Sequence, residues 1–239
     1  MCTVTFFPLQ GGGFILTSNR DERLSRSDTL PPVVYTETTE RLYYPRDQES
    51  SGTWIACSAS GKTFCLLNGG FEYHKSDPPY RKSRGLVLLE MLQASDPETY
   101  LKQEDLTGIE PFTLVMVQNN QGNIQLKELR WDGKIPHLKL LDSAFPHIWS
   151  SATLYGPEIR KAREDWFFRW LKENPRPEQH DLLHFHRFGG SGDGENDLVM
   201  KRSNDRQTIS ITSVYSFEGK YEMCYEDLVH ETKHRILIV

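Results

Sequence analysis

The chain has 239 residues, and its 28 lysines and arginines against 33 aspartates and glutamates give a formal net charge of −5. A mildly acidic chain lacks the basic stripe of general nucleic-acid-binding proteins, and its apolar runs are too short to span a bilayer. The length suits one domain or two small ones, and since no linker is visible we expect one domain over residues 1–239. Because no targeting segment is visible, we expect the protein in the cytoplasm. The sequence leaves the oligomeric state open.

The first quarter of the chain is predicted to form two β-hairpins. Residues 3–7 and 14–18 are rich in β-branched and aromatic side chains and flank a glycine-rich turn. Residues 53–57 and 63–67 repeat this pattern around a second turn. The highly charged residues 19–26 are predicted to leave the second strand as a turn.

The middle of the chain is predicted to contain two short helices and then three strands. The first helix is entered near Ser83, and Asp96 is a typical N-cap for a second helix over residues 97–104. Turn signals separate the strands predicted at residues 112–118, 124–130 and 138–141.

The last third is predicted to contain two helices followed by a hairpin. A long helix opens at Pro157 and ends at Asn174, and residues 178–186 form a further helix. Strands at residues 208–214 and 221–225 form the hairpin. Strands in hairpins and clustered helices indicate an α+β fold with antiparallel sheets.

Cys2 stands directly before the first predicted strand. Removal of the initiator methionine would leave this residue with both a thiol and a free α-amine. An α-amine has a reference pKa near 8, so one residue would supply a nucleophile and its base. The alternative is that Cys2 is merely a small, partly buried side chain.

The segment from Asn19 to Glu22 would lie opposite Cys2 if the first two strands form a hairpin. Arg20 would then lower the pKa of the thiol, and Asp21 would orient the α-ammonium group. The alternative is a solvated charged turn of little energetic value.

Several short motifs together resemble those of the NRDE family, whose eukaryotic member is Transport and Golgi organization protein 2. In family order, the motifs cover residues 1–2, 18–22, 52–55, 67–68, 83–87 and 206–209. The family in turn resembles N-terminal nucleophile hydrolases of the choloylglycine hydrolase type. This resemblance implies a four-layer αββα sandwich with the nucleophile at the end of a central strand.

The resemblance also implies a set of site residues. Its catalytic candidates are Cys2, Arg20, Asp21, Asn68 and Arg206, with Cys2 as nucleophile and Asn68 as either a donor to the oxyanion or a ligand contact. Its ligand-binding candidates are Asn19, Arg20, Glu22, Trp54, Arg84 and Ser151. Ser151 stands where the family pattern has an asparagine, and a hydroxyl has a shorter reach than an amide.

Three further groups of polar residues bear on the chemistry. His180 and His184 share a helix face, but no third partner completes a metal-ligand motif, so we expect no metal. Cys57 and Cys65 are expected to be buried and inert. Six basic residues could frame an anionic group such as a carboxylate or phosphate, namely Arg20, Arg23, Arg26, Arg81, Lys82 and Arg84. The alternative, which the sequence favours slightly, is that they belong to a solvated loop.

Two functions follow from these observations. The first is a cysteine amidohydrolase in which Cys2 attacks the carbonyl of a linear amide. The second is a non-catalytic carrier or chaperone, for which the resemblance implies haem, acyl-CoA or another lipid as the ligand. Neither function requires a bound cofactor, and haem would enter only as a ligand.

Overall fold

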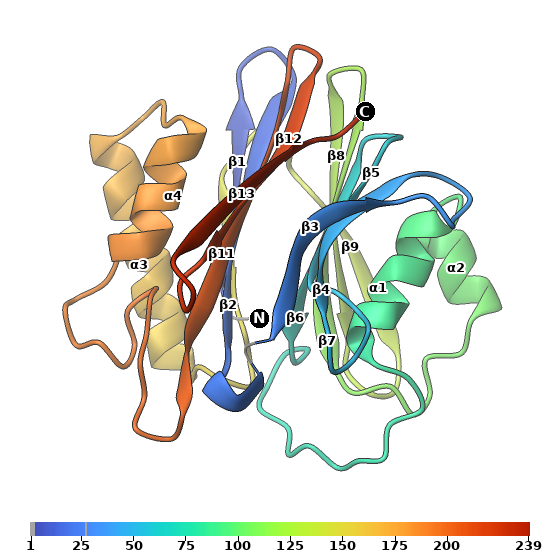
Figure 1. The fold of residues 1–239 in the computed structure, drawn as a ribbon, viewed down its shortest axis with the longest axis horizontal. Coiled ribbons are helices and arrows are strands. Elements are labelled where there is room, and N and C mark those ends of the chain that lie inside the picture. Colours follow the sequence, from blue (N-terminus) through green and yellow to red (C-terminus); the bar gives the residue numbers. More distant parts are fainter. Residues whose placement is uncertain (1–2, 27) are drawn as a thin grey trace.

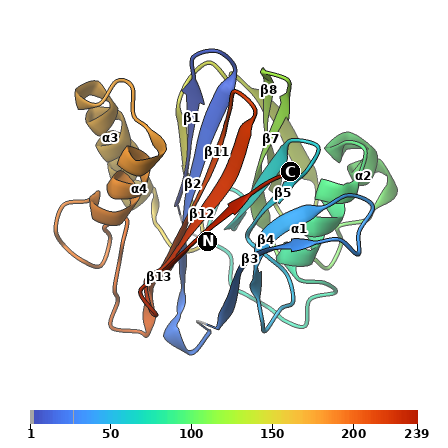
Figure 2. The ribbon, with the colours of Figure 1, turned by 45° about the horizontal axis from the view of Figure 1, so that its top comes forward.

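Two antiparallel sheets pack face to face, and each carries a pair of helices on its outer face (Figure 1). The structure is a computed structural model, and it describes residues 3–26 and 28–239. The order of layers is helices, sheet, sheet, helices, and a view turned by 45° shows the same order (Figure 2). This arrangement confirms the predicted four-layer αββα sandwich.

The first sheet has the strand order β10-β1-β2-β11-β12-β13. Its strands are β1 (Thr3–Leu9), β2 (Gly13–Arg23), β10 (His147–Ser150), β11 (Arg206–Phe217), β12 (Lys220–Asp227) and β13 (Thr232–Leu237). Two helices cover its outer face, α3 (Pro157–Glu173) and α4 (Gln179–Phe188). Segments from both ends of the chain therefore form one sheet.

The second sheet follows the chain, with the strand order β3-β4-β5-β6-β7-β8-β9. Its strands are β3 (Thr29–Tyr35), β4 (Leu42–Asp47), β5 (Ile55–Ser58), β6 (Lys62–Asn68), β7 (Phe112–Asn120), β8 (Asn123–Trp131) and β9 (Pro136–Leu141). Two helices cover its outer face, α1 (Arg84–Gln93) and α2 (Pro97–Gln103). A short 3-10 helix, η1 (Leu24–Arg26), links the two sheets.

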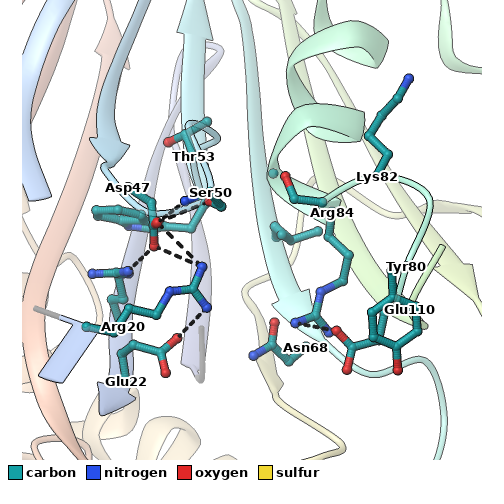
Figure 3. Close-up of a pocket in the computed structure, with 15 residues that line it drawn as sticks. Arg20, Glu22, Asp47, Ser50, Thr53, Asn68, Tyr80, Lys82, Arg84 and Glu110 are labelled. Carbon is teal, nitrogen blue, oxygen red and sulfur yellow. Dashed lines mark hydrogen bonds and ion pairs between the residues drawn. The ribbon is translucent and has the colours of Figure 1, made fainter. Parts of the chain in front are cut away.

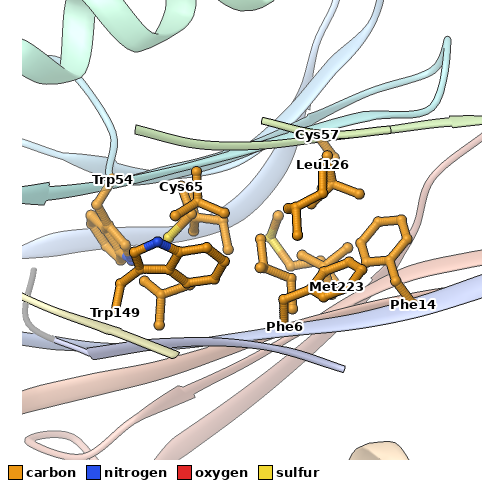
Figure 4. Packing of buried hydrophobic residues seen from close by; sticks show 14 of the residues in the cluster. Phe6, Phe14, Trp54, Cys57, Cys65, Leu126, Trp149 and Met223 are labelled. Atoms are coloured by element: carbon orange, nitrogen blue, oxygen red, sulfur yellow. The ribbon is translucent and has the colours of Figure 1, made fainter. Parts of the chain in front are cut away.

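Three apolar cores hold the four layers together. The central core lies between the sheets and contains Phe6 and Phe14 from one sheet and Cys57 and Cys65 from the other (Figure 4). A second core joins α1 and α2 to their sheet, and a third joins α3 and α4 to the other. The third contains Phe167, as the helical spacing of the aromatic residues in α3 predicts.

Residues 19–23 of the charged segment lie inside strand β2, so the prediction that the chain leaves the strand at residue 19 is wrong, and only residues 24–26, which form η1, lie outside it. Strand β11 supplies backbone partners along this segment, pairing Ile211 with Asn19 and Ser210 with Arg20. A register shift between Thr208 and Ser210 interrupts this pairing. Because β11 is more than 180 residues away in sequence, no local pattern indicates that the strand continues.

Most other predicted elements are confirmed, including both early hairpins and the late one. Ser83 caps α1 and accepts a hydrogen bond from Leu86, and Asp96 caps α2 by accepting one from Thr99. Strands β3, β4, β10 and β13 were not predicted as strands. Among the described residues, no helix combines the length and apolar character needed to cross a membrane.

Candidate functional site

Side chains along the end of β2 alternate between two environments. Leu16 faces the other sheet, whereas Ile15 faces the helices α3 and α4. The same alternation carries Arg20 toward the other sheet and Asp21 toward the helices, because successive side chains of a strand point to opposite faces. The two charged neighbours are therefore separated by the thickness of the sheet.

A cavity of about 310 Å³ opens on the side of β2 that faces the other sheet (Figure 3). Fifteen residues line it: Arg20, Glu22, Arg26, Asp47, Ser50, Thr53, Trp54, Leu66, Asn68, Tyr80, Lys82, Ser83, Arg84, Gly85 and Glu110. Four of these side chains are cationic and three are carboxylates. Trp54 and Leu66 are the large apolar residues among them, so the lining is strongly polar.

One wall of the cavity is built around the carboxylate of Asp47, at the end of β4. The Nη2 atom of Arg20 lies 2.5 Å from Asp47 Oδ2, and Arg26 reaches the same oxygen at 3.4 Å. The backbone nitrogen of Ser50 donates to Asp47 Oδ1 at 2.8 Å. Burial alone would raise the pKa of Asp47, but the hydrogen bonds from Ser50 and the two guanidinium charges outweigh it and lower this pKa.

The opposite wall is built around Arg84, in the first turn of α1 (Figure 3). Its Nη2 atom lies 3.0 Å from Glu110 Oε2, and its Nη1 atom donates to the carbonyl of Pro111 at 3.3 Å. Burial lowers the pKa of this guanidinium against the opposing charge of Glu110. Asn68, at the end of β6, lies between the two walls.

Two glycines bring α1 close to the loop that carries Trp54. A Cβ atom on Gly85 would lie 2.6 Å from the carbonyl oxygen of Thr53, and one on Gly52 would lie 2.9 Å from the carbonyl carbon of Gly85. No real side chain tolerates such distances to backbone. The glycines thus fix the position of Arg84 relative to Trp54.

Three buried nitrogen atoms of the lining have no hydrogen-bond partner among the described residues, and one of them, Arg26 Nε, is in an ion pair with Glu49 at 3.2 Å. The other two, Arg20 Nη1 and Trp54 Nε1, are buried from solvent. Neither has a hydrogen-bond partner among residues 3–26 and 28–239. The Arg20 guanidinium stacks over the Trp54 ring, with its central carbon 4.4 Å from the ring centroid. Burial lowers the pKa of Arg20, although Asp47 opposes this effect. Arg20 Nη1 and Trp54 Nε1 can only donate hydrogen bonds, so a molecule that binds to them must offer a hydrogen-bond acceptor.

On the helix-facing side of β2, Asn19 is tied to the buried ring of His186 in α4. Asn19 Nδ2 donates to the carbonyls of His186 at 3.0 Å and Leu198 at 2.8 Å, and its Oδ1 atom accepts from His186 Nδ1. Thr5 Oγ1 lies 2.7 Å from His186 Nε2. Burial, with a smaller contribution from Arg163, lowers the pKa of His186 to about 3, so the ring is neutral.

Asp21 and Arg163 belong to the same buried layer. Asp21 accepts hydrogen bonds from the hydroxyls of Tyr155 at 2.5 Å and Thr208 at 2.6 Å. The fully buried Arg163 of α3 stacks on the Tyr155 ring, 3.7 Å from its centroid, and donates through Nη1 to Thr3 Oγ1. This layer anchors the start of β1 and the end of β2 to the helices.

The structure brings together five of the predicted site residues: Arg20, Glu22, Trp54, Asn68 and Arg84. Lys82 and Arg26 of the predicted basic cluster join them, whereas Arg23 and Arg81 do not line the cavity. Cys2 lies outside the described residues, so its predicted role stays a prediction.

Four other predicted site residues lie away from the lining. Asn19 and Asp21 face the helices, as described above, because odd-numbered residues of β2 point that way. Arg206 pairs with Arg23 at the far end of β2. Ser151 is buried, and its hydroxyl donates to the carbonyl of Asn68 at 2.8 Å, so it contacts the site through that backbone.

Asp47 and Glu110 were missed by sequence reasoning. The only local signal at Asp47 is Ser50 three residues later, which is typical of a turn closed by an aspartate. Nothing in the sequence near Glu110 indicates that it pairs with Arg84. Both carboxylates are recognised only when the fold places them beside their arginines.

The remaining candidates have ordinary structural roles. Cys57 and Cys65 are buried, as predicted, and burial raises the pKa of each thiol to about 12, which disfavours the reactive thiolate. His180 is exposed beside Glu178 and Asp181. Within the described ranges, no group of three or more histidine, cysteine or acidic side chains could hold a metal ion.

Comparisons with known proteins agree on family and fold. Residues 1–184 match the family described as Transport and Golgi organisation 2. No curated protein sequence matches the chain. A cysteine-to-alanine mutant of conjugated bile acid hydrolase from Clostridium perfringens superposes with a TM-score of 0.60 at 10% identity, covering 100% of this chain and 92% of that one.

A second solved structure has the same fold. The Caenorhabditis elegans orthologue of N-acylethanolamine-hydrolyzing acid amidase superposes with a TM-score of 0.61 at 10% identity, over 89% of this chain and 92% of that one. Because the identity is only 10%, these two structural similarities establish the architecture alone, which is that of N-terminal nucleophile hydrolases.

Proposed function

We propose that this chain, which belongs to the Transport and Golgi organisation 2 family, is a cysteine amidohydrolase that cleaves a linear amide with Cys2 as its nucleophile. Both solved structures of the same fold are named as hydrolases, one of conjugated bile acids and one of N-acylethanolamines. Each of these substrate types contains a linear amide.

The observation that carries the proposal is the position of Arg20 relative to the start of β1. Cys2 immediately precedes Thr3 in the sequence, and Thr3 pairs with Asn19 of β2. The next residue of β2, Arg20, lines the cavity. Thr3, the sequence neighbour of Cys2, is therefore paired with the residue that precedes a buried guanidinium group lining a polar cavity, and this supports Cys2 as the nucleophile.

In the proposed reaction, the α-amine of Cys2 takes the thiol proton and the sulfur attacks the amide carbonyl carbon. The carbonyl π electrons move onto oxygen and form a tetrahedral oxyanion. This intermediate collapses to a thioester as the carbon–nitrogen bond breaks, and the proton held by the α-ammonium passes to the leaving amine. Water then adds to the thioester, which releases the acid and returns the proton to sulfur.

The residues in the cavity have roles that suit this chemistry. The Arg20 guanidinium favours the thiolate form of a nearby cysteine, since a positive charge lowers a thiol pKa. Asn68 carries an amide that can donate to the oxyanion. Ser151, which takes the place of the family asparagine, uses its hydroxyl to hold the Asn68 carbonyl instead.

The test is amine release from a panel of linear amides, measured for the wild type and for Cys2→Ala, Cys2→Ser and Cys224→Ala. Cys224 is a half-buried thiol of β12 and serves as the matched control. We expect turnover by the wild type and by Cys224→Ala, and a loss of at least a hundredfold in Cys2→Ala. Equal turnover by Cys2→Ala would overturn the mechanism.

Intact mass spectrometry gives a second, independent readout. The proposal requires that Met1 is absent from the active protein, because the α-amine of Cys2 must be free. It also predicts a transient mass increase, equal to the acyl group less the thiol hydrogen it replaces, when the protein is mixed with an activated ester. Binding of a ligand with no turnover by the processed protein would instead support the carrier function.

A further inference from the structure

The cavity leaves two hydrogen-bond donors for a ligand. Arg20 Nη1 and Trp54 Nε1 are both buried and belong to residues that line it. A buried donor without a partner is costly, and native proteins rarely keep one. The two donors belong to side chains that stack on each other, with the Arg20 guanidinium carbon 4.4 Å from the Trp54 ring centroid, and together they indicate that an acceptor binds beside them.

The carboxylates in the lining are already neutralised by neighbouring cations. Asp47 accepts from Arg20 and Arg26, and Glu110 pairs with Arg84. Glu22 lies 3.7 Å from Arg26. Lys82 is paired with Glu90, and Arg26 is also paired with Glu49; neither of these carboxylates is part of the lining. The lining itself therefore carries four cationic and three anionic side chains, and the two donors without partners, Arg20 Nη1 and Trp54 Nε1, suit an anionic acceptor.

The size and polarity of the cavity further restrict the ligand. A volume of about 310 Å³ is at the lower end of the range for small-molecule sites, which is roughly 300–1,000 Å³. Trp54 and Leu66 do not form a long apolar wall. The apolar surface that Trp54 and Leu66 offer is too small to cover a flexible hydrocarbon chain or a large macrocycle.

We propose that this cavity recognises a carboxylate or phosphate group on a small substrate, with Arg20 Nη1 and Trp54 Nε1 as donors at its inner wall and Arg84 on the opposite wall. That the bound molecule is a substrate rests on the proposed function. Recognition of an anion adds the substrate class, an amide of a small anionic molecule, to that function. Arginine and indole N–H groups are well suited to anionic oxygens.

The experiment titrates succinate and inorganic phosphate into Cys2→Ala at low ionic strength, with neutral succinamide as the uncharged control. We expect saturable binding of at least one anion and none of succinamide. Binding of phosphate alone assigns a phosphorylated ligand, and binding of succinate alone assigns a carboxylate. Binding of neither anion, or equal binding of succinamide, would overturn the proposal.

Two variants locate the bound anion. Trp54→Phe removes Nε1 and keeps an aromatic ring, so we expect binding to weaken about tenfold. Trp170→Phe, on the outer helix α3, is the matched control and should bind as tightly as the parent. Equal weakening in both variants, or none in Trp54→Phe, would refute the assignment.

An NMR measurement reports directly on the donor. The indole Nε1–H resonance of Trp54 is the one that disappears in Trp54→Phe, and we expect it to move during the anion titration. A resonance that stays fixed while the anion binds would show that the anion binds elsewhere. Because Cys2→Ala cannot perform the chemistry, this result is independent of the turnover assay. Each proposal can therefore fail alone.

Discussion

Replacing Arg163 by methionine should destabilise the protein by about 3 kcal/mol. Arg163 is fully buried in α3. It donates to the carbonyl of Asn196 at 3.0 and 3.2 Å, to the carbonyl of Asp197 at 2.7 Å and to the hydroxyl of Thr3. Methionine fills a similar volume but leaves these three acceptors unpaired.

The magnitude is the difference between two large contributions. One buried acceptor (Thr3) and two part-buried acceptors (Asn196 and Asp197) lose their donor, and each costs at most about 1–3 kcal/mol, or up to roughly 9 kcal/mol together. Removing the guanidinium also removes its own desolvation penalty, which is several kcal/mol. A net loss of about 3 kcal/mol would lower the melting temperature by roughly 6–12 °C for a chain of this length.

The assay compares denaturation midpoints of the wild type, Arg163→Met, Arg163→Lys and the exposed control Arg169→Met. Lysine keeps the buried charge but cannot span acceptors on two sides, so we expect Arg163→Lys to be at least as unstable as Arg163→Met. Arg169→Met should stay within about 0.5 kcal/mol of the wild type. Wild-type stability in Arg163→Met, or full rescue by lysine, would refute the reasoning.

Three further predictions test other parts of the fold. The pKa of His186 is about 3 in the folded protein against an unperturbed 6.5, so the unfolded chain takes up its proton first as the pH falls. The free energy of unfolding should therefore decrease between pH 6.5 and pH 3 by up to about 1.4 kcal/mol per pH unit, a slope that His186→Gln should lack. Gly85→Ala should destabilise by about 1–3 kcal/mol in thermal melts, because its Cβ meets backbone, whereas Gly156→Ala meets nothing within 4 Å and should melt as the wild type does. Alkylation at pH 8 should label Cys57 and Cys65 only after unfolding, and rapid labelling of the native protein would show that they are not buried as described.

Local patterns predicted much of the fold because their physical causes are local. The cap at Ser83, the proline that opens α3 at Pro157 and the turns between hairpin strands each depend on a few adjacent residues. Strand β4 was not predicted because it is buried on both faces: Tyr43 packs in the central core and Tyr44 in the core beneath α1 and α2. Its sequence therefore lacks the alternation of apolar and polar residues that indicates a half-buried strand.

The candidate site was predicted only in part, for a related reason. The sequence motifs indicate that Arg20 and Arg84 are special, and the structure places both in one cavity. They do not indicate which face of β2 each residue occupies, because the charged segment looks like a turn until β11 pairs with it. The partners Asp47 and Glu110 come from other strands and loops, and only tertiary structure brings them near.

The alternation along β2 makes the length of this strand a functional constraint. Deleting one residue between Ile15 and Asn19 would exchange the two faces of the segment that follows, so that Arg20 would meet the helices and Asp21 the cavity. A lengthened turn between β1 and β2, at residues 10–12, would leave both faces unchanged. Insertion scanning should therefore find a tolerant hairpin tip next to a strand in which a single-codon change abolishes the site.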